Sequence, residues 1–124
     1  MSGSNYDNPI HGTYLFPAAA IDTAAVIGRL AGPAGKTGRL VGVSTVITVA
    51  TTVAASQLNI GSASDADAYG TQAIAITAID GVITAYTDLT SDDNLITADT
   101  AVELSSDGGA TAGDGDITLY IDWF

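Results

Sequence analysis

The last nine residues of this chain constrain its fold most strongly, because apolar and polar side chains alternate there from Asp116 to Trp123. One set of alternate positions is apolar and the other is polar: Ile117, Leu119, Ile121 and Trp123 against Thr118, Tyr120 and Asp122. A two-residue period places the two sets on opposite faces of a β-strand. Ordering a chain end costs conformational entropy that packing must offset, so we expect 116–124 to be an inner strand that buries the single Trp.

Gly- and Asp-rich turns separate further short segments, of which 41–49 and, briefly, 57–60 show the same period. They predict strands over 24–30, 41–49, 57–60, 69–77, 82–86 and 100–104, although the Ala-rich part from 71 to 79 is also compatible with a turn or two of helix. We interpret the glycine-rich segment 31–38 as a hairpin turn. Since no amphipathic segment is long enough to cover a sheet, the pattern predicts an all-β fold, an antiparallel two-sheet sandwich or jelly-roll-like domain.

The chain has 124 residues, which suits one domain. Residues 1–17 carry Gly, Asn and Pro without a sustained period, so we predict an extended N-terminal arm over 1–17 and a single β-sandwich domain over 18–124. The arm holds too many large apolar side chains for a disordered tail. We therefore expect the arm to pack on its own domain or on a neighbour, and we select Tyr6, Ile10, Tyr14 and Phe16 as its candidates for partner contacts.

The chain is strongly acidic, with a formal net charge of -11 at pH 7. This charge repels phosphate backbones and anionic lipid surfaces, so neither nucleic acid nor a membrane is an expected partner. No apolar run reaches the length of a membrane helix, and the amino end lacks the pattern of a secretory signal. The three basic residues fall within one short stretch, and we expect them to anchor the protein to an acidic surface: Arg29, Lys36 and Arg39.

No motif in the sequence indicates catalysis or a cofactor. His11 is the single histidine and has no carboxylate or hydroxyl cluster near it in sequence, so we expect no enzyme. The absence of Cys excludes disulfides and, with one His, a typical zinc site. Segment 65–70 begins like a calcium loop, but Tyr69 interrupts the motif and no Glu follows at the required spacing. We expect solvated turns there and no metal, with calcium left open as an alternative.

Three groups of turns and strand ends carry a resemblance to a known class of protein. They are the segment Pro33–Arg39 leading into a Val/Thr strand, the segment Asn59–Gly61 followed by Ser64–Tyr69, and the stretch from Gly113 to Phe124. Together they resemble small virion proteins of tailed bacteriophages, the capsid decoration or cement proteins, over residues 24–124.

The resemblance implies a structural virion protein, often a homotrimer, that binds the major capsid protein on the outer surface of a phage head and stabilises capsomer junctions. It would be assembled in the host cytoplasm and located on the capsid surface. Another virion component, such as a tail, fibre or baseplate protein, is the first alternative. A calcium- or carbohydrate-binding β-sandwich module is the second, and an enzyme that depends on His11 is the most distant.

Overall fold

The computed structural model describes residues 10–52, 56–74, 83–88, 95–109 and 112–124. These residues form strands and loops, with no helix among them. The strands are β1 (Ile10–Ala20), β2 (Ala25–Leu30), β3 (Gly38–Thr52), β4 (Ser56–Gly61), β5 (Gly70–Ile74), β6 (Ile83–Asp88), β7 (Val102–Ser106) and β8 (Ala112–Trp123). The predicted all-β fold class is confirmed.

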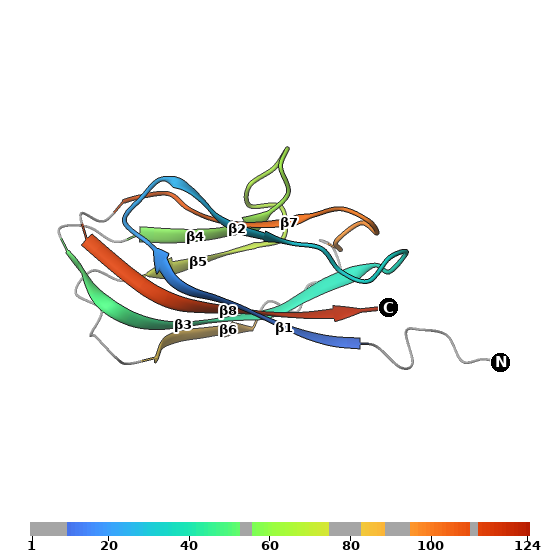
Figure 1. Ribbon diagram of the computed structural model, residues 1–124, viewed down its shortest axis with the longest axis horizontal. Coiled ribbons are helices and arrows are strands. Elements are labelled where there is room, and N and C mark those ends of the chain that lie inside the picture. Colours follow the sequence, from blue (N-terminus) through green and yellow to red (C-terminus); the bar gives the residue numbers. More distant parts are fainter. Residues whose placement is uncertain (1–9, 53–55, 75–82, 89–94, 110–111) are drawn as a thin grey trace.

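The strands form two four-stranded antiparallel sheets, one in the order β1-β8-β3-β6 and the other in the order β2-β7-β4-β5. We call them the first and the second sheet. Figure 1 shows them as two stacked layers, the second sheet above the first. Strands pair as β1 with β8, β2 with β7, β3 with β6 and β4 with β5. The strand pairs are nested in sequence, as in one long hairpin that has been wound up into two layers. This is the topology of a jelly roll.

Strand β8 lies inside the first sheet, paired with β1 on one side and β3 on the other. Its burial alternates without a break along the whole strand. The four apolar side chains of the carboxyl end face the second sheet and are at most 2 % exposed: Ile117, Leu119, Ile121 and Trp123. The prediction of an inner strand that buries the only Trp is confirmed.

The core lies between the two sheets and receives side chains from both of them. It is formed mainly by branched aliphatic residues, among them Leu40, Val43, Ile47, Leu58, Ile60 and Leu104. Strand β3 follows its predicted alternation only over its middle, where Val43, Thr45 and Ile47 are buried. Register shifts follow Leu40 and Ile47, and after the second shift Val49 turns outward and is 46 % exposed. A bulge inserts a residue and so reverses which side chains face the core.

The indole of Trp123 packs against two glycines, Gly32 and Gly38. From the sequence alone these glycines are expected only as turn residues. A Cβ atom at either Gly32 or Gly38 would stand 2.5 Å from the indole ring. Backbone hydrogen bonds in both directions join Thr37 to Phe124, with N···O distances of 2.9 and 2.8 Å. The loop before β3 therefore closes over the carboxyl end of the chain.

The segment 31–38 is not the turn of a hairpin, which corrects the sequence-based interpretation. Strand β2 belongs to the second sheet and β3 to the first, so the loop between them crosses from one layer to the other. Glycine and proline indicate that the chain turns, but they do not determine which strands pair afterwards.

The predicted arm is also shorter than expected, because residues 10–17 belong to β1 and therefore to the sandwich. Ile10 to Phe16 pair in unbroken register with residues 117–123 of β8. The sequence hides this strand because Gly12 and Pro17 interrupt its pattern, while its partner lies about a hundred residues away in the chain. Residues 1–9, the rest of the predicted arm, lie outside the described residues.

Candidate interaction edge

Strands β1 and β2 are the outermost strands of their sheets, and both lie on the same side of the sandwich. Among the described residues, each has a hydrogen-bonded neighbour on one side only. The two strands meet across the gap between the layers, where Phe16 of β1 packs on Gly28 of β2. A Cβ atom at Gly28 would be 2.6 Å from the Phe16 ring, so the glycine makes this close contact possible.

A pocket of about 330 Å³ opens at this edge, and we call it the edge pocket. Its lining side chains are apolar except for that of Thr23, and they come from β1, from β2 and from the short connection between them. The β1 wall is formed by Leu15, Phe16, Pro17, Ala19 and Ala20. The opposite wall is formed by Thr23, Ala25, Val26 and Ile27. Such an opening can take an apolar side chain or a short peptide segment, but it offers no charged group to bind a polar ligand.

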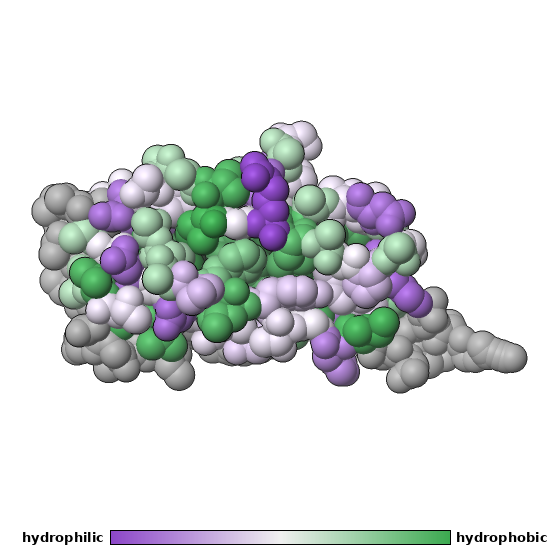
Figure 2. Space-filling model, viewed as in Figure 1, coloured by the Kyte–Doolittle hydropathy of each residue, from purple (hydrophilic) through white to green (hydrophobic). Residues whose placement is uncertain are grey.

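Large apolar side chains at the edge pocket are open to solvent. Leu15 is 60 % exposed and Val26 is 42 % exposed. Figure 2 views the molecule from this side and shows hydrophobic residues gathered in the middle of the face, over both layers. Exposed apolar groups that gather around a pocket are typical of an interaction surface, whereas single exposed apolar residues are not.

The backbone of both strands is irregular at the edge pocket. The register of β1 shifts between Phe16 and Ala19, and that of β2 shifts between Val26 and Gly28. Within the β1 bulge Ala18 has φ 51°, a left-handed conformation that costs free energy for any residue with a Cβ atom. The Ala18 N–H donates a hydrogen bond to Oδ1 of Asp116 on β8, at 2.9 Å, which holds the bulge in place.

A polar cluster fixes the chain just after β1. The buried Ser56 and Ser106 hydroxyls both donate to the carbonyl oxygen of Ile21. The Asp107 carboxylate accepts hydrogen bonds from the backbone N–H groups of Gln57 and Gly109, and its Oδ1 lies 3.2 Å from the Ser56 hydroxyl, which shares its single proton between this oxygen and the Ile21 carbonyl. Burial by itself raises the pKa of Asp107, but these hydrogen bonds together outweigh burial and hold the pKa below its usual value. The cluster therefore ties the end of β1 to β4 and β7 of the second sheet.

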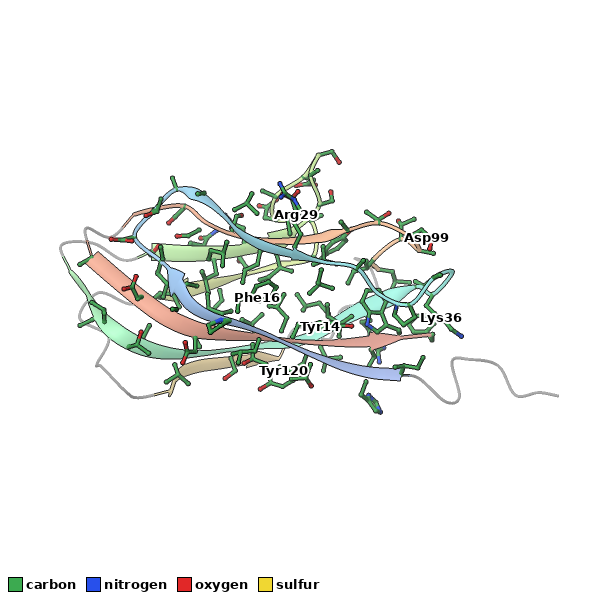
Figure 3. All side chains as sticks on the ribbon, viewed as in Figure 1. Tyr14, Phe16, Arg29, Lys36, Asp99 and Tyr120 are labelled. Carbon is green, nitrogen blue, oxygen red and sulfur yellow. The ribbon has the colours of Figure 1, made fainter. Side chains whose placement is uncertain are left out.

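Tyr14 and Phe16, which we expected to contact a partner, instead face the interior of their own domain. They lie opposite Leu119 and Ile117 in the β1–β8 register and pack against the core. The Tyr14 hydroxyl accepts a hydrogen bond from Nε1–H of Trp123 at 2.8 Å. Figure 3 shows both aromatic residues between the two layers. An inward position on an edge strand buries these side chains about halfway, so they pack on their own domain, which is one of the two arrangements expected for the arm. Contact of Tyr14 and Phe16 with a partner stays a prediction.

The other two members of the predicted arm set have different outcomes. Ile10, the first residue of β1, is 48 % exposed and stays a candidate for contact. Tyr6 lies outside the described residues. Sequence reasoning missed Leu15, the most exposed of the large apolar residues at the edge. The alternation of Tyr14, Leu15 and Phe16 would have placed Leu15 on the opposite face, had the strand been recognised.

The three basic residues do not form one surface, although they are close in sequence. Arg29 lies on β2 in the second sheet, where its Nε donates to Oε2 of Glu103 at 2.8 Å. Arg39 lies on β3 of the first sheet, opposite Asp122 in the β3–β8 register. Lys36 belongs to the loop between the sheets, and Figure 3 shows it far from Arg29. The three charges therefore lie on three different elements in two layers, and they do not form a single basic anchor.

The register brings His11 beside a carboxylate that the sequence does not place near it. Nδ1 of His11 and Oδ1 of Asp122 are 2.6 Å apart across the β1–β8 pair. The imidazole is 75 % exposed, so solvent weakens this interaction. A third acidic, histidine or cysteine side chain that could complete a metal site with them is not found in the described part of the chain. We interpret the pair as a cross-strand contact between β1 and β8.

The acidic loop 62–69 forms a compact turn rather than a cage for a cation. Its backbone hydrogen bonds run between Ser62 and Asp65 in both directions, and the Ala68 N–H donates to the carbonyl oxygen of Asp65. Two further Asp-containing segments could add calcium ligands from other parts of the chain. Residues 92 and 93 lie outside the described residues, and Asp114 and Asp116 lie on β8. The described residues include no helix that is long and apolar enough to cross a membrane.

Comparisons of this chain with protein-family models, with curated proteins and with solved structures find no match.

Proposed function

We propose that this chain is a structural virion protein, a capsid decoration or cement protein that binds the outer surface of a phage head. The observation that carries the proposal is the open edge of the sandwich, where β1 and β2 surround an apolar pocket. An exposed apolar edge in an otherwise acidic chain is suited to adhesion, because the free energy falls when another surface covers the apolar groups and removes them from water.

The fold supports the same class of role, but only by analogy. Jelly rolls occur in viral capsid domains, and also in lectins and cupins. Since one fold serves many functions, the topology is compatible with a virion protein and does not by itself select one. The resemblance in the turns 33–39, 59–69 and 113–124 adds the more specific expectation of a decoration protein.

In this proposal the protein strengthens a shell by adding many equivalent contacts. A standard protein interface buries about 1,600 Å² in total, and repetition over a lattice turns a modest affinity into a high occupancy. The major capsid protein is the proposed partner, and the surface of the virion is the proposed location. Self-association as a homotrimer, which the resemblance implies, stays a prediction.

The direct test is to mix the purified protein with isolated undecorated heads and to image the particles. We expect symmetric added density at the capsomer junctions and heads that resist heating better than untreated ones. Density confined to tails would favour the alternative of a tail, fibre or baseplate component. No added density on heads at saturating protein would overturn the decoration role.

A matched pair of variants asks whether the edge pocket takes part in binding. Val26 and Val49 are similarly exposed, at 42 % and 46 %, but only Val26 lines the pocket. Val26→Asp introduces a charge into the apolar opening, and we expect it to lower head occupancy at limiting protein. Val49→Asp adds the same charge on β3 and is expected to leave occupancy unchanged. Equal occupancy for both variants would remove the pocket from the proposal.

A further inference from the structure

We propose that the edge pocket binds a segment of the partner protein in which one large apolar side chain stands between basic residues. The apolar side chain enters the pocket, and the lysine or arginine side chains on either side of it lie against carboxylates that surround the opening. This occupant rests on the proposed function, because it specifies the chemistry of the partner at the same pocket. The sign of the partner's charge, however, can be tested separately from the binding to heads.

The pocket itself selects an apolar side chain. Its volume of about 330 Å³ is at the small end of ligand-sized openings, and none of the described residues that line it carries a charge. A leucine or phenylalanine side chain suits such an opening and would also cover the exposed Leu15 and Val26. A charged side chain would lose its hydration on entering and would find no group of opposite charge there.

Three carboxylates lie next to the walls of the pocket, outside its lining. Asp22 belongs to the connection between β1 and β2, where it accepts a hydrogen bond from the hydroxyl of the following residue at 3.3 Å. Asp116 of β8 accepts the hydrogen bond from the N–H of Ala18, which lies within the β1 wall. Asp114 lies opposite Ala20, the last residue of that wall, in the β1–β8 register. A segment that fills the pocket therefore lies close to these carboxylates.

The chain has only three basic residues, and none of them is placed to neutralise these carboxylates. Arg29 lies on β2 but is already paired with a glutamate of β7, with Nε and Oε2 2.8 Å apart. Arg39 lies opposite Asp122 of β8, eight residues from Asp114 and so about 26 Å along the strand. Lys36 precedes Arg39 in the loop before β3. Since exposed charges are screened beyond a Debye length of about 8 Å at physiological ionic strength, the charge close to the pocket is negative.

Charge complementarity then determines what surrounds the apolar side chain of the occupant. A segment with lysine or arginine on both sides of that side chain is attracted to the carboxylates, whereas an acidic segment is repelled. A second copy of this chain would bring a further formal charge of -11 to the same place. The partner surface is therefore basic at this site, whereas we expected from the sequence an acidic partner surface for the three basic residues.

Two substitutions at one exposed position separate the partner's charge from its apolar part. Val26→Lys and Val26→Asp both place a charged group at the pocket, but the charges have opposite signs. With undecorated heads at limiting protein and low salt, we expect Val26→Lys to bind more weakly than Val26→Asp by about two- to fivefold, as for one exposed ion pair. Equal losses, or a larger loss for Val26→Asp, would overturn the basic character of the partner. No loss for either variant would overturn both this inference and the use of the pocket in decoration.

A second position controls for the change in net charge. Thr71 is exposed on β5, at the other side of the sandwich from the pocket. Thr71→Lys and Thr71→Asp change the net charge as the two Val26 variants do, and we expect them to bind heads equally well. A difference between them as large as that between the Val26 variants would show that the overall charge, and not the pocket, determines the effect.

The carboxylates themselves are tested by replacing them with amides. Asp22→Asn and Asp116→Asn remove a negative charge and keep an oxygen that can accept the same hydrogen bond. We expect each to weaken head binding by about two- to fivefold and to make the binding less sensitive to added salt. Asp67→Asn, in the exposed loop 62–69, is the matched control and should behave as the unmodified protein. Equal effects of all three substitutions would overturn the placement of the basic groups.

Synthetic peptides test the pocket in the absence of heads. The probe is a peptide with one leucine between two pairs of lysines, and its binding is followed by the amide NMR shifts of residues 15–20 and 23–27. Replacing the leucine with alanine should weaken binding by about tenfold, and replacing the lysines with glutamates should abolish it. Binding of the alanine or the glutamate peptide as tight as that of the probe would overturn the inference. Specific binding of the probe by a protein that leaves heads bare would support the inference and overturn the decoration role.

Discussion

Strands β8 and β1 pair with each other along most of their length, yet they make different contributions to the molecule. Strand β8 has a hydrogen-bonded neighbour on both sides, and its inward apolar side chains are at most 2 % exposed. Within the part of the chain that the structure describes, strand β1 has a hydrogen-bonded neighbour on one side only, and its inward residues Tyr14 and Phe16 are half-buried. Its outward Leu15 is 60 % exposed.

This difference follows from position in the sheet and not from the composition of the strands. Both strands carry large apolar residues at alternate positions. Neighbours on both sides of an inner strand remove those residues from water, whereas an edge strand leaves part of their surface exposed. Strand β8 therefore contributes more to the stability of the fold, while β1 presents more of its apolar surface to solvent. Four experiments test this difference between the two strands.

The largest effect is expected from replacing the same residue type in the two strands. Leu119→Ala empties a fully buried site on β8 and should lower the free energy of unfolding by about 2–5 kcal/mol. Leu15→Ala on β1 should change it by no more than about 0.5 kcal/mol. Urea denaturation followed by far-UV circular dichroism, at a low protein concentration, measures both. Equal losses would show that β1 is as deeply packed as β8.

A smaller loss is expected where the loop before β3 closes over Trp123. Gly32→Ala places a methyl group against the indole ring, and we expect a loss of about 1–3 kcal/mol in the free energy of unfolding. The same replacement should cost less in a Trp123→Phe background, because the smaller ring leaves room. If a double-mutant cycle gave independent effects, the contact would not limit the packing of the β8 end.

The third experiment replaces Ala18, the residue of the β1 bulge that has a left-handed backbone conformation. Ala18→Gly relieves the left-handed conformation, worth about 1–2 kcal/mol, at a cost of about 0.5–1 kcal/mol in chain entropy. We expect an unchanged or slightly higher melting temperature. Ala20→Gly, two residues further along the same strand, has no such strain to relieve and should lower it. A lower melting temperature for Ala18→Gly would show that the bulge carries no strain.

The smallest effect concerns the cluster that ties the end of β1 to the second sheet. The pKa of Asp107 is lowered in the folded state, so its contribution to stability is complete above its ordinary value of 3.8 and is lost as pH falls through the lower folded value. Asp107→Asn should therefore lose less stability than the unmodified protein between pH 5 and about pH 2. Asp67→Asn, in an exposed loop, is the control. Parallel pH profiles for all three proteins would contradict the role of the Asp107 hydrogen bonds.

The sequence by itself determined the fold class and the identity of the central strand. The uninterrupted alternation of 116–124 has one solution, a strand with a single buried face, and Trp123 could be assigned to the core from its place in that pattern. The middle of β3 and strand β4 follow from the same local signal, while β2 and β7 are expected from short segments between turns. Local periodicity suffices where buried positions alternate, as they do along most of β4.

Only the tertiary structure decided which strands are neighbours and where the edges lie. The pairing of β1 with β8, the crossing of segment 31–38 between layers and the contact of His11 with Asp122 all join residues that no local pattern relates. The edge pocket depends on the same pairings, because it exists only where two edge strands from different sheets meet. The alternation of residue types in a segment shows which face of the strand is apolar. Which strands become neighbours, and which lie at the edge of a sheet, depends on how the whole chain reduces its exposed apolar surface and its unpaired backbone groups.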